Sequence, residues 1–336
     1  MESGDALERL THLLQGYRAT CLLIAGVQLG LIEQLSAGPL SEAELARRMN
    51  SHSPSLTRFL RGLEAIGIIE RDPTGIRLSA MGKLLLKDES VMADIALLTG
   101  EEYLPAWANL RHTVQTGGTA FDASFGMSAW EHRKQRPELN EAFTRLMRNA
   151  QDRTQRAVLS AYDFSPCHLV VDVGGGSGTL MAEILGANPS CTGVVFDQPH
   201  VVAHVQNGMP HPPALRNRCQ FVAGSFFESI PTGGDIYLLQ HILHDWDDPQ
   251  CLEILRNCHA AMQPASKLLI IENLLPDTPP PAHDLVMLDL HMMAVLGGRE
   301  RTRPEFEQLL ASAGFSVTLS LPTQAQTTII EAARSS

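Results

Sequence analysis

The sequence predicts an α/β protein in which a doubly wound parallel sheet follows a helical N-terminal module. Three observations lead to this prediction. From residue 168 onward, short apolar runs alternate with segments of helical pattern. The first of these runs ends in a glycine-rich turn at 174–178. Before residue 100, helical patterns dominate and a single hairpin signal interrupts them.

The N-terminal 100 residues have the pattern of a winged helix. Residues 1–35 carry leucines at helical spacing, with too much apolar surface for one exposed face. Ser41 and Glu44 match a capping box that starts a further helix, and 53–66 predicts the next one. Two apolar runs then flank the turn Asp72-Pro73-Thr74-Gly75, which indicates a hairpin. Helix, turn, helix and hairpin in this order are typical of a winged-helix module.

A winged helix raises the alternative of a DNA-binding regulator. Arg47, Arg48, Arg58 and Arg61 lie in or near its second helix. The net charge of −11 disfavours a nucleic-acid partner and an anionic membrane surface. No apolar run approaches the length that spans a bilayer. The six cysteines are scattered without a C-x-x-C pair, and the first ten residues lack a secretory pattern, so we expect a cytoplasmic protein with reduced thiols.

The second part of the chain predicts a sheet that closes with a hairpin. After a mostly helical stretch, five apolar runs have the length and composition of strands, and two more near the C-terminus form an apparent hairpin. The predicted strands are 169–173, 193–197, 219–223, 235–240 and 267–272, and the hairpin strands are 315–321 and 327–332.

The glycine-rich turn favours a nucleoside over a dinucleotide. Gly174, Gly176 and Gly178 follow a G-x-G-x-G pattern, whereas the dinucleotide fingerprint needs G-x-G-x-x-G. Asp197 ends the next predicted strand, where a carboxylate accepts hydrogen bonds from ribose hydroxyls. A purely structural glycine turn is the alternative, and the carboxylate shifts the interpretation towards a nucleoside ligand.

Five sequence blocks in a fixed order resemble one protein family. They look like the S-adenosylmethionine-dependent O-methyltransferases of the plant caffeate and hydroxyindole type, together with their bacterial small-molecule branch. The blocks are Asp172-Val173-Gly174-Gly175-Gly176-Ser177-Gly178, Asp197-Gln198-Pro199, Gly224-Ser225-Phe226-Phe227, His244-Asp245-Trp246 and Gly297-Gly298-Arg299-Glu300-Arg301-Thr302.

The resemblance implies a domain organisation. It implies a class I methyltransferase, Rossmann-like sheet of seven strands, one of them antiparallel, in residues 101–336. It implies that 1–100 is a helical, winged-helix dimerisation domain and that the chain forms a homodimer. The helical linker 101–160 is then expected to contribute to the substrate cleft.

The predicted candidate side chains gather at the carboxyl ends of the strands, where open α/β sheets bind ligands. Asp197 ends the second strand and Gly224-Ser225-Phe226 the third. His241 and His244 follow the fourth strand, and Glu272 ends the fifth. A histidine at this edge is suited to remove a proton from a phenolic hydroxyl.

The resemblance assigns roles to these positions. It implies that His244 is the general base and that Glu272 and Glu300 orient it. It implies cofactor contacts from Gly174, Asp197, Ser225, Phe226, Gln240 and Trp246. Two of these depart from many plant members, because Ser225 stands where they have Asp and Gln240 where they have Lys. The acceptor is expected to contact Phe143, Met147, His291, Met292 and Met293, for each of which helix packing is the alternative.

The site residues and the resemblance together predict an S-adenosylmethionine-dependent O-methyltransferase that acts on a hydroxyl of an aromatic small molecule, with no metal cofactor. The resemblance alone implies a setting in bacterial secondary-metabolite biosynthesis. One alternative is N-methylation of a heteroaromatic acceptor such as a phenazine. Another is hydroxylation or decarboxylation on the same fold. A metal site formed by His241, His244, Asp245 and Asp248 is a further alternative for the histidine pair.

Overall fold

The computed structural model describes residues 3–208, 217–277 and 283–335. The chain divides into two compact units, which are described separately. One comprises Met1–Asn109 and Ser124–Asn149, and the other Leu110–Ala123 and Ala150–Ser336. The family domain boundary expected at residue 100 stays a prediction.

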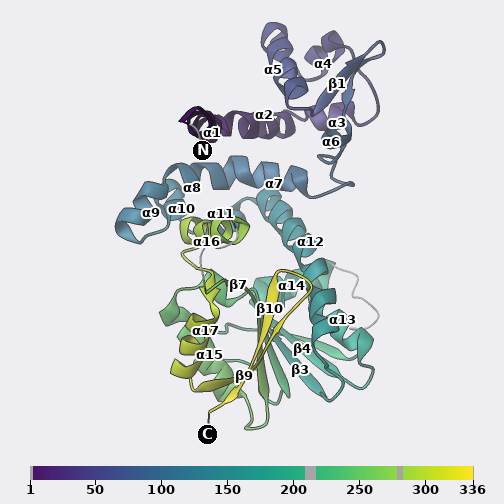
Figure 1. Cartoon of the computed structure of the whole chain (residues 1–336). Helices are drawn as coiled ribbons and strands as arrows, with labels where there is room; N and C mark the ends of the chain where they lie inside the picture. The colour runs from purple at the N-terminus through teal and green to yellow at the C-terminus, as the bar shows by residue number, and fades with distance from the viewer. Residues whose placement is uncertain (1–2, 209–216, 278–282, 336) are drawn as a thin grey trace. The chain divides into compact units, whose positions relative to one another are not determined.

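The N-terminal unit contains the expected helices and hairpin (Figure 1). Strand β1 pairs with β2 in antiparallel register across the predicted turn, with Asp72 opposite Gly75. Leucines and isoleucines from α3, α4, α5 and both strands share one apolar core. Its first elements are α1 (Ser3–Gln15), α2 (Tyr17–Gln28), α3 (Leu31–Leu35), α4 (Glu42–Arg48), α5 (Ser53–Ala65), β1 (Ile69–Asp72), β2 (Gly75–Leu78), α6 (Ala80–Lys83) and α7 (Met92–Leu98).

Only one of the two hydrogen bonds of the predicted capping box is present at the start of α4. The hydroxyl of Ser41 accepts a hydrogen bond from the Glu44 amide at 3.2 Å. The Glu44 carboxylate turns instead to Arg47 and Arg48, with contacts of 2.7 and 2.6 Å. Two of the four arginines of the DNA-binding alternative are therefore paired with one carboxylate of their own helix.

Further helices complete this unit and cross into the next. A single π-helical turn, Thr99–Tyr103, separates α7 from the helix that follows it. The long helix α12 belongs to both units. These helices are α8 (Leu104–Ala108), α9 (Leu110–Thr116), α10 (Ala120–Phe125), α11 (Ala129–Gln135) and α12 (Pro137–Ala161).

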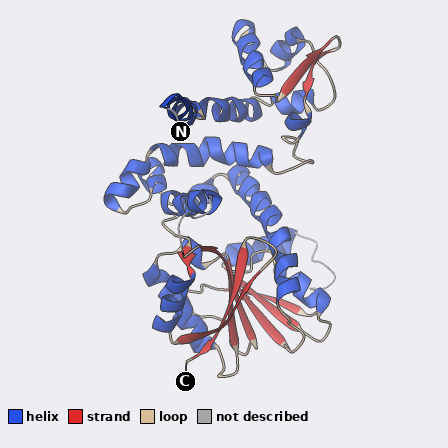
Figure 2. Ribbon diagram, viewed as in Figure 1, coloured by secondary structure: helices blue, strands red, loops and turns tan. Residues whose placement is uncertain are grey.

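The second unit contains the predicted sheet, with strand order β5-β4-β3-β6-β7-β10-β9 (Figure 2). The five strands from β5 to β7 pair in parallel, and β10 is antiparallel to both of its neighbours. The short β8 pairs with the end of β7, off this path. The strands are β3 (Leu169–Val173), β4 (Thr192–Asp197), β5 (Cys219–Ala223), β6 (Ile236–Gln240), β7 (Lys267–Leu275), β8 (Arg301–Thr302), β9 (Phe315–Pro322) and β10 (Thr327–Arg334).

Alternating side chains of the strands build two cores, one on each face of the sheet. On β6, Tyr237 and Leu239 pack with α15 and α17, whereas Ile236 and Leu238 pack with α13 and the end of α12. Figure 2 shows these helices on opposite sides of the strands. The helices of this unit are α13 (Thr179–Ala187), α14 (Pro199–Gly208), a 3₁₀ turn (Leu243–Asp245), α15 (Asp248–Ala261), α16 (His283–Val295) and α17 (Arg303–Ser312).

The class I methyltransferase sheet and the single antiparallel strand expected from the sequence are confirmed. Crossover connections between parallel strands place the loops after β3, β4, β5, β6 and β7 at one edge of the sheet. In the part of the chain that the structure describes, no helix is long and apolar enough to cross a membrane.

Candidate active site

The loop after β3 requires glycine at successive positions. Gly174 has a φ of +75°, and a Cβ there would lie 2.4 Å from the side chain of Ile242. At Gly175 a Cβ would lie 2.6 Å from the carboxyl group of Asp172. Gly176 and Gly178 also have positive φ. The glycines of this loop therefore carry no side chains that would cover its main chain between β3 and α13, so a ligand can approach the backbone closely.

Asp197 is held against this loop by backbone amides. Its Oδ2 accepts a hydrogen bond of 2.8 Å from Gly176, and its Oδ1 accepts one of 2.6 Å from Gln198. Burial raises the pKa of Asp197, and these two amides counteract part of that effect. Burial and the nearby charge of Asp197 raise the pKa of Asp172 to about 7. The β3 and β4 ends thus present one oriented, partly exposed carboxylate with acceptor capacity for hydroxyl groups.

Aromatic side chains form a wall beside the β5 and β6 ends. Phe226, Phe227 and Trp246 contact one another edge to face, with ring centroids 4.9–5.9 Å apart. Asn257 fixes the Phe226 backbone through a 2.8 Å hydrogen bond to its carbonyl oxygen. Ser225 accepts a hydrogen bond from the Phe227 amide at 3.3 Å. The wall offers flat apolar surface against which a purine or another aromatic ring packs.

Gln240 contributes an unpaired donor at the end of β6. Its Nε2 is buried and finds no hydrogen-bond partner among residues 3–208, 217–277 and 283–335. A buried amide donor in this condition is destabilising unless a ligand or water completes it. Its position at the strand end supports the expected cofactor contact.

His244 lies on the 3₁₀ turn after β6 and meets three carboxylates. Its Nδ1 lies 2.9 Å from Oε1 of Glu300 and 3.7 Å from Oε2 of Glu272. Its Nε2 lies 3.5 Å from Asp245. The predicted base and its two predicted partners are therefore brought together by the fold.

Glu272 is fixed by the main chain of the same turn. Its Oε1 accepts hydrogen bonds of 3.0 Å from both the Ile242 and Leu243 amides, and its side chain is fully buried. Oε2 faces the imidazoles and has no hydrogen bond within the described residues. Burial favours the neutral carboxyl, but the charges of His244 and His241 hold the pKa of Glu272 below its usual value.

The carboxylates favour a protonated imidazole. Burial alone would lower the pKa of His244, but the charge of Glu272 and the hydrogen bond to Glu300 raise it to about 10. A proton on Nδ1 that is donated to Glu300 leaves the lone pair of the neutral ring on Nε2.

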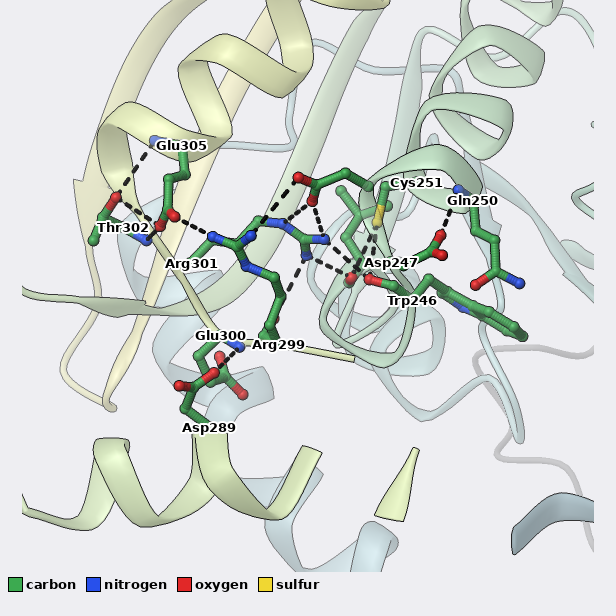
Figure 3. Close-up of polar contacts among 12 residues, drawn as sticks. Trp246, Asp247, Gln250, Cys251, Asp289, Arg299, Glu300, Arg301, Thr302 and Glu305 are labelled. Carbon is green, nitrogen blue, oxygen red and sulfur yellow. Dashed lines mark hydrogen bonds and ion pairs between the residues drawn. The ribbon is translucent and has the colours of Figure 1, made fainter. Parts of the chain in front are cut away.

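The loop 297–302 docks on the turn that carries His244 (Figure 3). Arg301 is 1% exposed, and its guanidinium donates to the carbonyl oxygens of Leu243 at 2.8 Å and Trp246 at 3.0 Å. It also binds Asp248 at the start of α15 at 2.7 Å. The Arg299 amide donates to the His244 carbonyl at 2.9 Å.

Close backbone packing and a second carboxylate complete this docking. At Gly298 a Cβ would lie 1.9 Å from the carbonyl oxygen of His244, so only glycine fits. The Glu300 amide donates to Asp289 of α16 at 2.9 Å (Figure 3). The loop therefore fixes the backbone of the base turn and the side chain that orients the ring.

The expected acceptor contacts fall in both units. His291, Met292 and Met293 lie on α16, with Met292 buried and the other two half-buried. Phe143 and Met147 lie one turn apart on α12, in the N-terminal unit. There the Arg133 guanidinium lies 3.9 Å from the Phe143 ring centroid, and Trp130 meets that ring edge-on. Contact of these five residues with an acceptor stays a prediction.

The structure adds residues whose roles the sequence did not indicate. Arg301 belongs to the last of the five family blocks, but no local pattern in the sequence predicts that its side chain is buried. His241 has a φ of +52°, and its Nδ1 lies 3.5 Å from Oε2 of Glu272. The sequence suggested Asp248 as a possible metal ligand beside the two histidines, but Asp248 forms an ion pair with Arg301. Glu272 lies beside His241 and His244 in its place.

Comparisons with known proteins identify the family to which the chain is similar. A family model described as an O-methyltransferase domain matches residues 107–316, and one described as an O-methyltransferase dimerisation domain matches 11–88. The chain is 38% identical to a phenazine O-methyltransferase of Lysobacter antibioticus over 96% of this chain and 95% of that one. It is 36% identical to the mitomycin biosynthesis 6-O-methyltransferase of Streptomyces lavendulae over 94% and 91%.

A solved structure provides a similar fold with bound ligands. It is an O-methyltransferase from neocarzinostatin biosynthesis in complex with S-adenosylmethionine and 2-hydroxy-5-methyl naphthoic acid. It matches with 30% identity and a TM-score of 0.81 over 94% of this chain and 95% of that one.

Proposed function

The chain belongs to the S-adenosylmethionine-dependent O-methyltransferase family, and we propose that it methylates a hydroxyl of an aromatic small molecule in bacterial secondary-metabolite biosynthesis. The names of its relatives support this setting, since they include phenazine and mitomycin methyltransferases and a naphthoic acid complex. The observation on which the proposed mechanism rests is the 2.9 Å contact between His244 and Glu300.

His244 acts as the general base in this proposal. Its Nδ1–H donates to Glu300, so Nε2 of the neutral ring accepts the proton of the acceptor hydroxyl. The raised pKa of His244, about 10, is close to that of a phenol, which permits an almost balanced proton transfer. Glu272 stabilises the imidazolium that forms, and its hydrogen bonds to two backbone amides keep it in place.

The residues at the strand ends fit the cofactor. The glycine loop at Gly174 allows a ligand to approach the main chain closely. The carboxylate of Asp197 can accept hydrogen bonds from hydroxyl groups, and the unpaired amide of Gln240 can donate one. Ser225, Phe226 and Trp246 add hydrogen-bonding capacity and an aromatic wall. When bound, S-adenosylmethionine supplies an electrophilic methyl group on a positively charged sulfur.

A homodimer and a cytoplasmic location complete the proposal. Helix α1 exposes Leu7, Leu10, Leu13 and Leu14, and Leu13 is 80% exposed. The last turn of α1, with Leu13 and Leu14, falls inside the matched dimerisation domain, and an apolar stripe of this kind supports association with a second copy. All six cysteines are free, which is consistent with a reducing compartment.

A His244→Ala variant tests the proposed base. Turnover of a hydroxylated aromatic acceptor should fall by at least about 100-fold, because general-base catalysis contributes roughly that much. Affinity for S-adenosylhomocysteine, measured by calorimetry, should change less than threefold (about 0.7 kcal/mol). His168→Ala, at an exposed histidine of the same unit, is the matched control. Full activity of His244→Ala would refute the base assignment.

The same variant separates O-methylation from N-methylation. A hydroxylated and an N-heteroaromatic acceptor are assayed in parallel, and methyl gain is measured by mass spectrometry. Loss confined to the hydroxylated acceptor supports the proposal. The proposal would be contradicted if the wild type methylated the nitrogen acceptor faster than the hydroxylated one and His244→Ala kept that activity.

A further inference from the structure

The candidate base lies in a cluster of imidazoles and carboxylates with unpaired buried atoms. Nδ1 of His241 and one oxygen each of Glu272 and Glu300 are buried and make no hydrogen bond within the part of the chain that the structure describes. Both carboxylates are almost completely inaccessible to solvent. Two carboxyl groups and the His241 imidazole, each with an unpaired atom, therefore lie together in a place of low dielectric, where a bound cation would supply the missing partners.

The donor atoms have spacings that a metal ion can satisfy. Donor atoms of His241, His244 and Glu272 lie within 4.8 Å of one another. Neighbouring donors are 3.5 Å apart between His241 and Glu272, 3.7 Å between Glu272 and His244, and 2.9 Å between His244 and Glu300. Ligands about 2.0–2.2 Å from a zinc ion lie roughly 3–3.5 Å from each other, so small side-chain shifts bring His241, His244 and Glu272 into coordination. Glu300 lies outside this group but contacts His244, which makes it the nearest fourth donor.

We propose that His241, His244, Glu272 and Glu300 form an inhibitory binding site for a divalent transition-metal ion such as Zn²⁺. Two imidazole and two carboxylate donors suit Zn²⁺ better than Mg²⁺, which prefers oxygen ligands and retains its waters. The two histidine side chains are 24% and 13% exposed, so the ion reaches the buried carboxylates past the imidazoles.

Inhibition follows from the tautomer of His244, and this step rests on the proposed function. Zn²⁺ bound to Nδ1 takes the lone pair of that nitrogen, and the proton that Nδ1 donated to Glu300 must leave. From the imidazolium, one proton is released to solvent. From the neutral ring, the proton moves to Nε2. In both cases Nε2 carries the remaining proton and cannot accept one from a hydroxyl.

Titration of the full-length protein with Zn²⁺ tests the site without any substrate. Calorimetry in a reducing, chelator-free buffer should show one equivalent whose affinity falls roughly 10- to 100-fold or more in His241→Ala. His259→Ala is the matched control, since His259 is a similarly half-buried histidine packed against Phe315 in the same unit. Magnesium at the same concentrations should give no comparable binding.

The outcomes separate the two proposals. Equal Zn²⁺ affinity in wild type and His241→Ala, or no binding by wild type, would overturn the metal site. Zn²⁺ should also lower the wild-type methylation rate, reversibly with EDTA, and His241→Ala should keep a larger fraction of its own metal-free rate. If His241→Ala weakens zinc binding but zinc leaves the wild-type methylation rate unchanged, the metal site is supported and the assignment of His244 as the base is wrong.

Discussion

Nη1 of Arg301 donates a 2.8 Å hydrogen bond to the carbonyl oxygen of Leu243, the residue directly before the proposed base. The same guanidinium reaches the carbonyl of Trp246, so it spans the turn on which His244 lies. Cys251 donates to both of these carbonyls from α15, at 3.2 and 3.5 Å. The base turn is therefore fixed from two elements by backbone contacts that do not involve the imidazole.

Replacement of Arg301 by Met should loosen this turn. Removal of the guanidinium leaves the two buried carbonyls without their charged donor and leaves Asp248 with only the 3.7 Å contact to Arg299, so the free energy of unfolding should fall by about 2–4 kcal/mol. Urea unfolding measures this change, and kcat should fall at least tenfold (about 1.4 kcal/mol) through misplacement of His244.

Two further variants of this region distinguish position from charge. Arg301→Lys keeps the charge with fewer directed donors and should have an intermediate kcat. Arg303→Met removes an exposed arginine paired with Glu307, so its free energy of unfolding should change by no more than about 0.5 kcal/mol. If both methionine variants behave alike, the role assigned to Arg301 is wrong.

Stability should decrease with pH because of His244. Its folded pKa of about 10 exceeds the ordinary value of 6.5, so its contribution is complete below pH 6.5 and is lost as pH rises to about 10. Over this window the slope is at most about 1.4 kcal/mol per pH unit. The difference in urea stability between wild type and His244→Asn, measured from pH 6 to 10.5, reports it. A difference independent of pH would contradict the electrostatic arrangement described above.

Activity should rise with pH for the same reason. The base must be neutral to accept a proton, and Glu272 and Glu300 keep it protonated near neutrality. Replacement of Glu300 by Gln removes a charge beside Nδ1 but keeps a hydrogen-bond acceptor, so the acid limb of the kcat–pH profile should move to lower pH. If the acid limb of the kcat–pH profile stayed at the same pH or moved to higher pH, it would count against orientation of His244 by Glu300.

Gly174→Ala should weaken cofactor binding. The positive φ costs a residue with a Cβ about 1–2 kcal/mol, and the added methyl group meets Ile242 beside the base turn. We expect the dissociation constant for S-adenosylhomocysteine, measured by calorimetry, to rise at least tenfold (about 1.4 kcal/mol). Gly186→Ala on α13 is the control, because nothing lies within 4 Å of its Cβ and its φ is ordinary. An equal effect at both glycines would refute a specific requirement at Gly174.

Charges on the apolar face of α1 should prevent dimerisation. Leu10→Asp combined with Leu13→Asp places two carboxylates on the exposed leucine stripe, whereas His12→Asp places one away from it. Light scattering at micromolar concentration should show a monomer for the double variant and a dimer for the control. A wild-type monomer, or a dimeric double variant, would argue against the proposed interface.

Local patterns in the sequence determined the elements of this fold. Apolar runs of strand length predicted β3 to β7 to within a few residues. The pattern is strongest in β3, β6 and β7, which are largely buried on both faces and rich in branched residues. The glycine turn after β3 was equally local, since Gly174, Gly176 and Gly178 adopt a positive φ that the absence of a Cβ permits. The antiparallel strand and the roles of His244, Glu272 and Glu300 came from the family resemblance.

Only the tertiary structure decided how those residues share partners. Arg301 and Leu243 lie 58 positions apart, and sheet register and crossover connections, which local sequence does not report, brought them together. The same packing pairs Asp248 with Arg301 and places Glu272 beside both His241 and His244. The possible metal ligands therefore differ from those that sequence spacing suggested. Side-chain partnerships at strand ends depend on neighbouring strands, and for that reason the composition of the cluster became visible only in the folded chain.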